Sequence, residues 1–272
     1  MLTRIKNLLQ YRELIAVLTW KNIALRYKQA YLGIAWTVAK PIMLVAIFTV
    51  MRSFIGIDSS NVPYPILTFA ALMPWILFQE SASDGVNSVV GNANLIRKIY
   101  FPREVFPLTS VVTKTVDFGI NLVILIALMA WYHFAPPVHV LWLPLLLLYT
   151  LFAALVIAFA GAALNVYYRD VAVALPVALS LMMYMSPVIY PLHLVREKLI
   201  VQHAVGEWSN TLYTVYMRNP LAGIIDSFQR TLQKGLPPDW NVVLPGLALT
   251  LALLPLSYLY FKRAESHFAD VV

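Results

Sequence analysis

Long apolar runs separated by short polar connections make up most of this chain. Six runs are long enough for membrane-spanning helices, and they cover residues 33–54, 64–83, 108–131, 141–167, 171–190 and 242–261. A helix needs about 20 apolar residues to cross a bilayer core about 30 Å thick. The runs lack strand-like alternation, and in lipid every backbone amide must be satisfied internally. The pattern therefore predicts an all-α integral membrane protein with six transmembrane helices.

Composition supports a membrane rather than an aqueous environment. The 272 residues are 60% hydrophobic and 12% charged, whereas about a quarter of the residues of a soluble domain are charged. The net charge of +7 is spread among the apolar runs, as membrane-facing loops require, so we expect no nucleic acid partner. The chain has no cysteine, which excludes disulfides and thiolate chemistry.

The distribution of basic residues predicts the orientation in the membrane. With the N-terminus in the cytoplasm, fourteen of the 20 Lys and Arg residues lie on the cytoplasmic side and six lie on the opposite side. Loops rich in Lys and Arg stay in the cytoplasm. We therefore expect a multi-pass protein of the cytoplasmic (inner) membrane with both termini in the cytoplasm.

The segment before the first apolar run has two unlike sides when it is projected as a helix. Its apolar side carries Ala16, Trp20, Ile23 and Tyr27, and its polar side carries Lys21, Asn22, Arg26, Lys28 and Gln29. Such a helix lies along the membrane surface with its bases toward anionic lipid. We divide the chain into an interfacial segment, 1–30, and a single transmembrane domain, 31–272. An ordinary solvated helix is the alternative for the first segment.

Two connections differ from simple loops. Residues 92–103, NANLIRKIYFPR, are too polar to cross the membrane, and Pro102 and Pro107 disfavour helix just before them. A short helix between such breaks is suited to docking a cytoplasmic partner; alternatively, its bases only enforce topology. Residues 191–240 mix polar residues with short apolar runs, which favours interfacial or re-entrant helices packed against protein.

The sequence contains no motif for catalysis or nucleotide binding. It has no G-x-x-x-x-G-K-[ST] loop, no H-E-x-x-H and no G-x-S-x-G, and its five histidines lack metal-ligand spacing. We therefore expect no catalytic residue, no metal and no cofactor in this chain. Any energy that its function needs has to come from elsewhere.

Some polar and aromatic residues lie within or near the apolar runs. Lys40, Glu80, Asp84, Lys114 and Asp117 are ionisable, and charges at membrane depth are costly. Lys114 and Asp117 are three residues apart, and we favour a structural ion pair over a proton relay. Aromatic rings can line a path for sugars as well as pack or face lipid, and the candidates for this are Trp36, Phe69, Trp75, Phe78, Tyr184 and Tyr190.

Several stretches, in this order, resemble the membrane permeases of ABC-2 type polysaccharide exporters, which carry O-antigen, capsule or teichoic acid. Residues 20–41, WKNIALRYKQAYLGIAWTVAKP, are similar to the interface helix that leads into the first span of that family. Residues 94–110, NLIRKIYFPREVFPLTS, are similar to its cytoplasmic coupling segment. Further similar stretches are YYRDV at 167–171, SPVIYP at 186–191 and RNPLAGIIDSFQR at 218–230.

The resemblance implies a type V ABC exporter fold and a set of partners. It implies a homodimer of six-helix subunits with a polymer channel along the dimer interface. Each subunit would contact a separate ATPase subunit, which binds ATP and Mg²⁺. Short helices within 196–234 would form a gate on the far side. The residues that it assigns to ATPase coupling are Asn94, Leu95, Ile96, Arg97, Lys98, Tyr100, Phe101, Pro102 and Arg103.

The expected function is passage of a lipid-linked polysaccharide, driven by ATP hydrolysis on the partner. Arg26 and Lys28 would meet the lipid pyrophosphate at the cytoplasmic entrance. An ABC-2 permease for a drug, peptide or lipid is the first alternative. A membrane-embedded glycosyl or acyl transferase would need convergent carboxylates or histidines, and an ion-coupled carrier would need inverted repeats; neither feature is evident.

Overall fold

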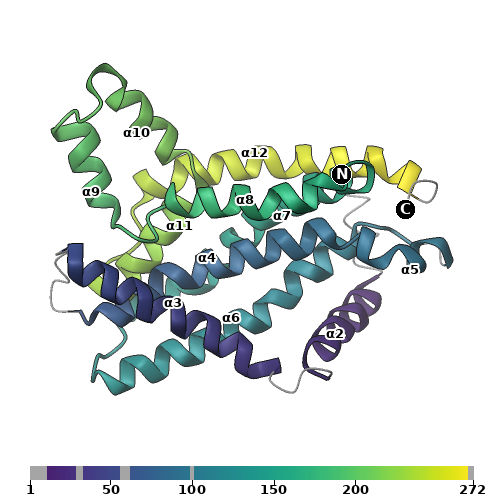
Figure 1. Ribbon diagram of the computed structural model, residues 1–272, viewed down its shortest axis with the longest axis horizontal. Coiled ribbons are helices and arrows are strands. Elements are labelled where there is room, and N and C mark those ends of the chain that lie inside the picture. The colour runs from purple at the N-terminus through teal and green to yellow at the C-terminus, as the bar shows by residue number, and fades with distance from the viewer. Residues whose placement is uncertain (1–10, 29–32, 56–61, 99–100, 269–272) are drawn as a thin grey trace.

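The computed structural model describes residues 11–28, 33–55, 62–98 and 101–268 of the 272. In these ranges all regular structure is helical, and no strand occurs. The long helices are α2 (Arg12–Lys28), α3 (Gly33–Ile55), α4 (Tyr64–Asn87), α6 (Val105–Trp131), α7 (Leu143–Tyr167), α8 (Asp170–Tyr184) and α12 (Trp240–Ala264). Figure 1 shows α3, α4, α6, α7, α8 and α12 side by side as an elongated bundle.

The six apolar runs coincide with six of these helices, and three helices meet the length and hydropathy of a membrane span. The three are Val105–Trp131, Val138–Tyr167, which includes the short helix η2 (Val138–Trp142), and Trp240–Ala264. Two shorter apolar helices are Val38–Met51 and Asp170–Tyr184. The fifth run was predicted to continue to Tyr190, but α8 ends at Tyr184. Pro187 explains the early end, because it lacks an amide donor and disfavours helix at Ser186.

Helix α4 forms the centre of the bundle. Seventeen of its 24 residues are buried, and it packs against α3, α6, α7, α8 and α11 (Pro220–Gln229). Small residues bring α4 and α7 together: a methyl group at Gly85 would overlap Ala158, and one at Gly161 would overlap Val86. Close packing of this kind drives helix association in lipid, where the solvent is as apolar as the side chains.

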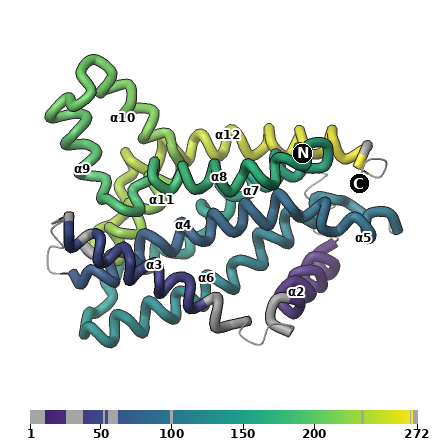
Figure 2. Tube along the Cα trace, in the orientation of Figure 1, coloured from purple at the N-terminus to yellow at the C-terminus, as the bar shows by residue number. Residues whose placement is uncertain are grey.

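The long connection between α8 and α12 folds into short helices. They are α9 (Leu192–Arg196), η3 (Glu197–Val201), η4 (Gly206–Trp208), α10 (Ser209–Met217), α11 and η5 (Arg230–Lys234). The Cα trace shows α9 and α10 projecting from one end of the bundle (Figure 2). In contrast, α11 is packed inside, where Leu221, Ile224, Ile225 and Phe228 are fully enclosed. The prediction that this connection is not a plain loop is confirmed.

Helix α2 lies beside α6, apart from the main bundle (Figure 2). Leu18 is buried and Tyr11, Leu14 and Ile15 pack with it, so these residues form the side that faces the protein. Trp20, on the predicted apolar side, is 71% exposed. The helix therefore packs one apolar side on the protein and exposes other apolar side chains, among them Trp20. The prediction that it lies along the membrane surface stays a prediction.

Candidate functional site

The candidate site is the end of the bundle that carries α5 (Ala93–Lys98), opposite the projecting helices α9 and α10 (Figure 1). The short helix η1 (Val90–Asn92) leads from α4 into α5. Ile96 is buried in a cluster with Phe101 and Phe106, whereas Asn94, Arg97 and Lys98 are exposed. Ile96 and the partly buried Leu95 thus anchor α5, and the outer face of the helix is polar and basic.

The segment after α5 is fixed to the last helix of the chain. Glu104 is buried and forms an ion pair with Lys262, with 2.8 Å between Oε2 and Nζ. The Tyr258 hydroxyl donates a hydrogen bond to Glu104 Oε1 at 3.3 Å. The amide of Arg103 donates to Glu265 Oε1 at 2.9 Å, and the Arg103 guanidinium donates to the Glu265 carbonyl oxygen. We call Arg103, Glu104, Tyr258, Lys262 and Glu265 the α12 clamp.

The α12 clamp joins the segment after α5 to α12 through several polar contacts. Glu104 and Lys262 are separated by 158 positions in sequence, yet their charges meet in a largely desolvated setting. Aromatic contacts support the ion pairs, because Phe101 packs on Phe106 and Phe159 packs on both Tyr258 and Phe261. An open hollow of about 500 Å³ lies beside the clamp, lined by Tyr11, Phe101, Pro102, Arg103, Lys262, Glu265 and Ser266.

A second group of charged side chains lies between α3, α4 and α6. The Lys114 side chain is 5% exposed, and its Nζ lies 2.9 Å from Asp84 Oδ2, 3.1 Å from Glu80 Oε2 and 3.7 Å from Asp117 Oδ2. Lys40 on α3 reaches the other oxygen of Glu80, with 2.9 Å between Nζ and Oε1. All five ionisable residues that the sequence placed near membrane depth therefore form one group, which we call the Lys114 network.

The Lys114 network changes the prediction that Lys114 pairs with Asp117. That ion pair exists, but its 3.7 Å separation is the longest of the three around Lys114. The shorter contacts come from α4, so the network joins helices rather than only two turns of α6. A charge in lipid is stable only when it is paired or hydrated, which explains why these residues converge. In the ranges that the structure describes, no group of three or more His, Cys, Asp or Glu side chains is placed to hold a metal ion.

The structure distributes the remaining candidate residues unevenly. Phe69, Trp75 and Phe78 are each at most 2% exposed and pack in the core around α4, with 6.1 Å between the ring centroids of Trp75 and Phe78. Tyr184 is 64% exposed at the end of α8, and Tyr190 donates a hydrogen bond to the Tyr184 carbonyl oxygen at 2.7 Å. The side chains of Arg26, Lys28 and Trp36, and all of Tyr100, lie outside the described residues.

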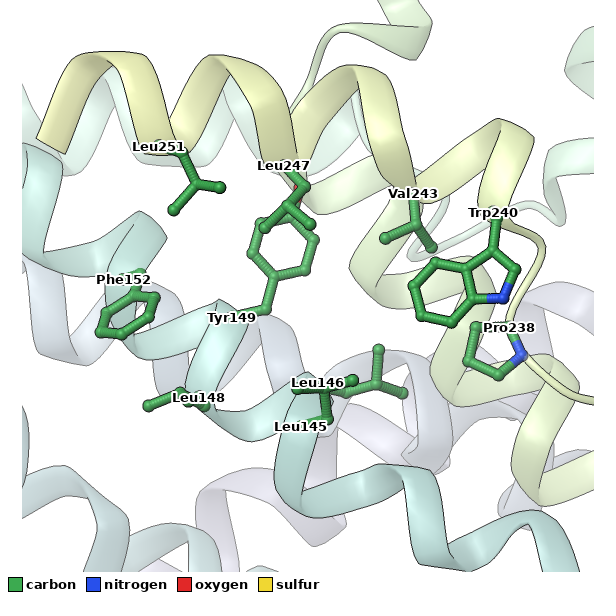
Figure 3. Close-up of a pocket in the computed structure, with 10 residues that line it drawn as sticks. All are labelled: Leu145, Leu146, Leu148, Tyr149, Phe152, Pro238, Trp240, Val243, Leu247 and Leu251. Atoms are coloured by element: carbon green, nitrogen blue, oxygen red, sulfur yellow. The ribbon is translucent and has the colours of Figure 1, made fainter.

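Two further hollows differ in chemistry. A polar crevice of about 280 Å³ lies between α2, α4 and α6, and its walls include Asn22, Asp84, Asn87, Asn92 and Ser110. An apolar hollow of about 110 Å³ lies between α7 and α12. Figure 3 shows leucines of both helices, Phe152 and Tyr149 around it, with Trp240 and Pro238 at one end. The apolar hollow is suited to hydrocarbon, whereas the crevice is suited to a hydrogen-bonding ligand.

Sequence reasoning missed the partners within the α12 clamp. Lys262 entered only the count of cytoplasmic bases, and Glu104, Tyr258 and Glu265 were not singled out. Glu104 follows the proline-arginine pair directly, so an acid beside the coupling segment was visible in the sequence. Its partner was not visible, because nothing local connects residue 104 to residue 262.

Comparison with known proteins identifies the family of this chain. Residues 13–205 match the family model described as ABC-2 type transporter. The O-antigen export system permease protein RfbA of Myxococcus xanthus is 27% identical over 273 residues, which cover the whole of both chains. Two proteins of the same name from Klebsiella pneumoniae are 26% and 27% identical, and each alignment covers 96% of this chain and 95% of the relative. The family match includes both α5 and the helices that hold the Lys114 network, and this chain belongs to the ABC-2 type transporter family.

Proposed function

We propose that this chain is the membrane-spanning subunit of an ABC transporter that exports a lipid-linked polysaccharide, such as O-antigen, across the inner membrane. Family membership supports transport, and relatives aligned over nearly the full chain are named as O-antigen export permeases. In this proposal α3, α4, α6, α7, α8 and α12 are the six spans, and both termini are cytoplasmic. The chain is no enzyme by itself, and a separate subunit binds and hydrolyses ATP.

The observation that carries the proposal is the α12 clamp. An ATPase that closes on ATP pushes on the outer face of α5, where Asn94, Arg97 and Lys98 are exposed. The Glu104–Lys262 ion pair and the contacts of Arg103 with Glu265 pass this displacement to α12. Helix α12 packs on α11, which joins η5 and the projecting α9 and α10 region. The far-side short helices then act as a gate at the other end of α12.

A second copy of the chain would complete the transporter. Helix α8 has one buried residue, Leu179, and its Val173, Val177 and Leu181 are more than 60% exposed. Helix α3 also has an exposed apolar side, which includes Ile47 and Phe54. In the dimer, lipid and the partner copy cover these faces, and the polysaccharide passes between the copies near Tyr184. Phe69, Trp75 and Phe78 contribute packing to each subunit.

Co-purification with the ATPase tests this proposal. The tagged chain is extracted from its native membranes in mild detergent, and bound subunits, ATP hydrolysis and attached glycan are measured. We expect an ATP-hydrolysing complex that contains polysaccharide. The double variant Arg97→Glu, Lys98→Glu should insert normally but lose the ATPase subunit, because it reverses the charge of the docking face.

The matched control is Arg169→Glu, which reverses an exposed charge in the turn between α7 and α8. This variant should retain the ATPase subunit. Purification of the wild-type chain without any ATPase would contradict the proposal. Retention of the ATPase by the double variant would instead remove α5 as its docking site.

A further inference from the structure

The polar crevice between α2, α4 and α6 has the character of a built binding site. It is walled by α2, α4, α6 and the short helix η1, and its volume of about 280 Å³ is just below the usual range of ligand pockets, about 300–1,000 Å³. Asn22 comes from α2, Asp84 and Asn87 from α4, Asn92 from η1 and Ser110 from α6. Residues distant in sequence thus place amide, hydroxyl and carboxylate groups around one space.

Other residues hold several of these side chains in position. Lys114 approaches the Asp84 carboxylate at 2.9 Å, and Lys114 is itself buried. The Asn87 amide nitrogen donates to the Ser83 carbonyl oxygen at 2.9 Å, and Asn165 donates to Asn87 Oδ1 at 3.4 Å. The Asn92 amide nitrogen donates to the Ser88 carbonyl oxygen at 2.8 Å. Groups fixed in this way lose little conformational freedom when a ligand binds.

The chemistry of the walls favours a neutral, hydroxyl-rich ligand. Asn and Ser side chains offer both donors and acceptors, and Asp84 accepts hydrogen bonds from hydroxyl groups. The described lining residues carry one acid and no base, and the cation paired with that acid, Lys114, is already surrounded by three carboxylates. A phosphate in the crevice would meet a carboxylate without a free counter-charge. A sugar ring would satisfy the walls without that repulsion.

We propose that this crevice binds the first sugar unit of the lipid-linked substrate at the cytoplasmic side of the membrane. The inference rests on the proposed function and adds a location for the sugar. Asn22 and Arg26 are four residues apart and so occupy neighbouring positions on one face of α2. The last turn of α2, residues 25–28, therefore follows directly on the part of the helix that lines the crevice, and its sequence contains two basic residues.

The test compares two probes on the complete transporter, with its ATPase, in lipid nanodiscs. One probe is a polyprenyl diphosphate that carries a single N-acetylhexosamine, and the other is the same polyprenyl diphosphate without sugar. The wild-type complex should bind the sugar-bearing probe about tenfold more tightly, as two or three net hydrogen bonds allow. The double variant Asn22→Leu, Ser110→Leu fills the crevice and should bind both probes with equal affinity.

The control is Thr115→Leu, on the same helix as Ser110 but outside the crevice, and it should keep the tenfold preference. Recovery of the complex with its ATPase verifies that each variant is folded. The proposed sugar site is wrong if the double variant still prefers the sugar-bearing probe, or if the wild type binds both probes equally. Either result leaves the proposed function intact. If the wild type binds neither probe, both the proposed sugar site and the proposed export of a lipid-linked polysaccharide are contradicted.

Discussion

Helices α4 and α8 are both rich in apolar residues, but α4 is largely buried in the subunit and α8 is largely exposed. Seventeen of the 24 residues of α4 are buried by neighbouring helices, whereas only Leu179 of α8 is buried. Helix α4 nevertheless carries Glu80 and Asp84, and α8 carries a charge only at its first residue, Asp170. Because the protein surrounds α4, its carboxylates can be paired with Lys114. Most of the apolar surface of α8 is exposed in the subunit, so a charged side chain there would have no such partners from neighbouring helices.

This contrast shows what hydropathy measures in a membrane protein. It reports the average polarity of a segment, and by this measure α8 is one of the shorter apolar helices. Neither α8 nor α4 is among the three helices with the length and hydropathy of a membrane span. Hydropathy does not report how much of the segment touches other helices. The interior of the bundle tolerates polar groups that its lipid-facing surface would not.

We expect the largest loss of stability when Lys114 is removed from the Lys114 network. Lys114→Leu leaves Glu80, Asp84 and Asp117 close together without their shared cation, and removal of one partner from a buried ion pair costs about 3–5 kcal/mol. The free energy of unfolding in mixed detergent micelles measures the loss. Adding Asp84→Asn and Glu80→Gln should recover part of it, because fewer uncompensated carboxylates remain. A variant as stable as the wild type would show that the network is hydrated rather than buried.

A charge on α8 should have the next largest effect. Val177 and Tyr168 are 61% and 66% exposed, so a water-exposed protein would tolerate lysine equally at both. Val177 lies mid-helix in α8, however, where lysine costs about 2.5–3.5 kcal/mol at the bilayer centre. We expect Val177→Lys to lower membrane insertion and Tyr168→Lys, in the turn before α8, to leave it unchanged. A glycosylation-tag insertion assay measures both, and equal insertion would place α8 in water.

The crossing of α4 and α7 should respond to added volume. Gly161→Leu places a side chain where Val86 already lies, and overpacking of this kind costs about 1–3 kcal/mol. The same change at Gly119 of α6, where a methyl group would meet no atom within 4 Å, should have little effect. Thermal unfolding of the two purified variants in one detergent provides the comparison. Equal melting temperatures would mean that α4 and α7 do not depend on this close approach.

Much of the fold could be predicted from the sequence because its strongest signals are local. The apolar runs set the long helices, and Pro102 and the bases of α5 marked the coupling segment. Contacts that join distant segments could not be predicted in this way. The ionisable residues of α3, α4 and α6 were visible, but their convergence on Lys114 depends on the helix order in space. For the same reason Phe69, Trp75 and Phe78 could not be distinguished from surface aromatics by hydropathy.

Replacement of Lys40 should change the stability least, and it tests whether the α3 surface around Lys40 is exposed to water or buried between subunits. Its side chain is 52% exposed in the single subunit, and an exposed ion pair such as that with Glu80 contributes about 0–1 kcal/mol. We therefore expect Lys40→Met to change the free energy of unfolding of the isolated subunit by less than about 1 kcal/mol. The same measurement on the assembled complex asks whether a second copy covers Lys40. A loss in the complex that approaches the cost of Lys114→Leu would mean that the α3 surface is buried between subunits, because only a desolvated lysine makes its pair so expensive to break. An equally small loss in both states would leave Lys40 facing water, and the subunit contact would have to lie farther along α3 or on α8.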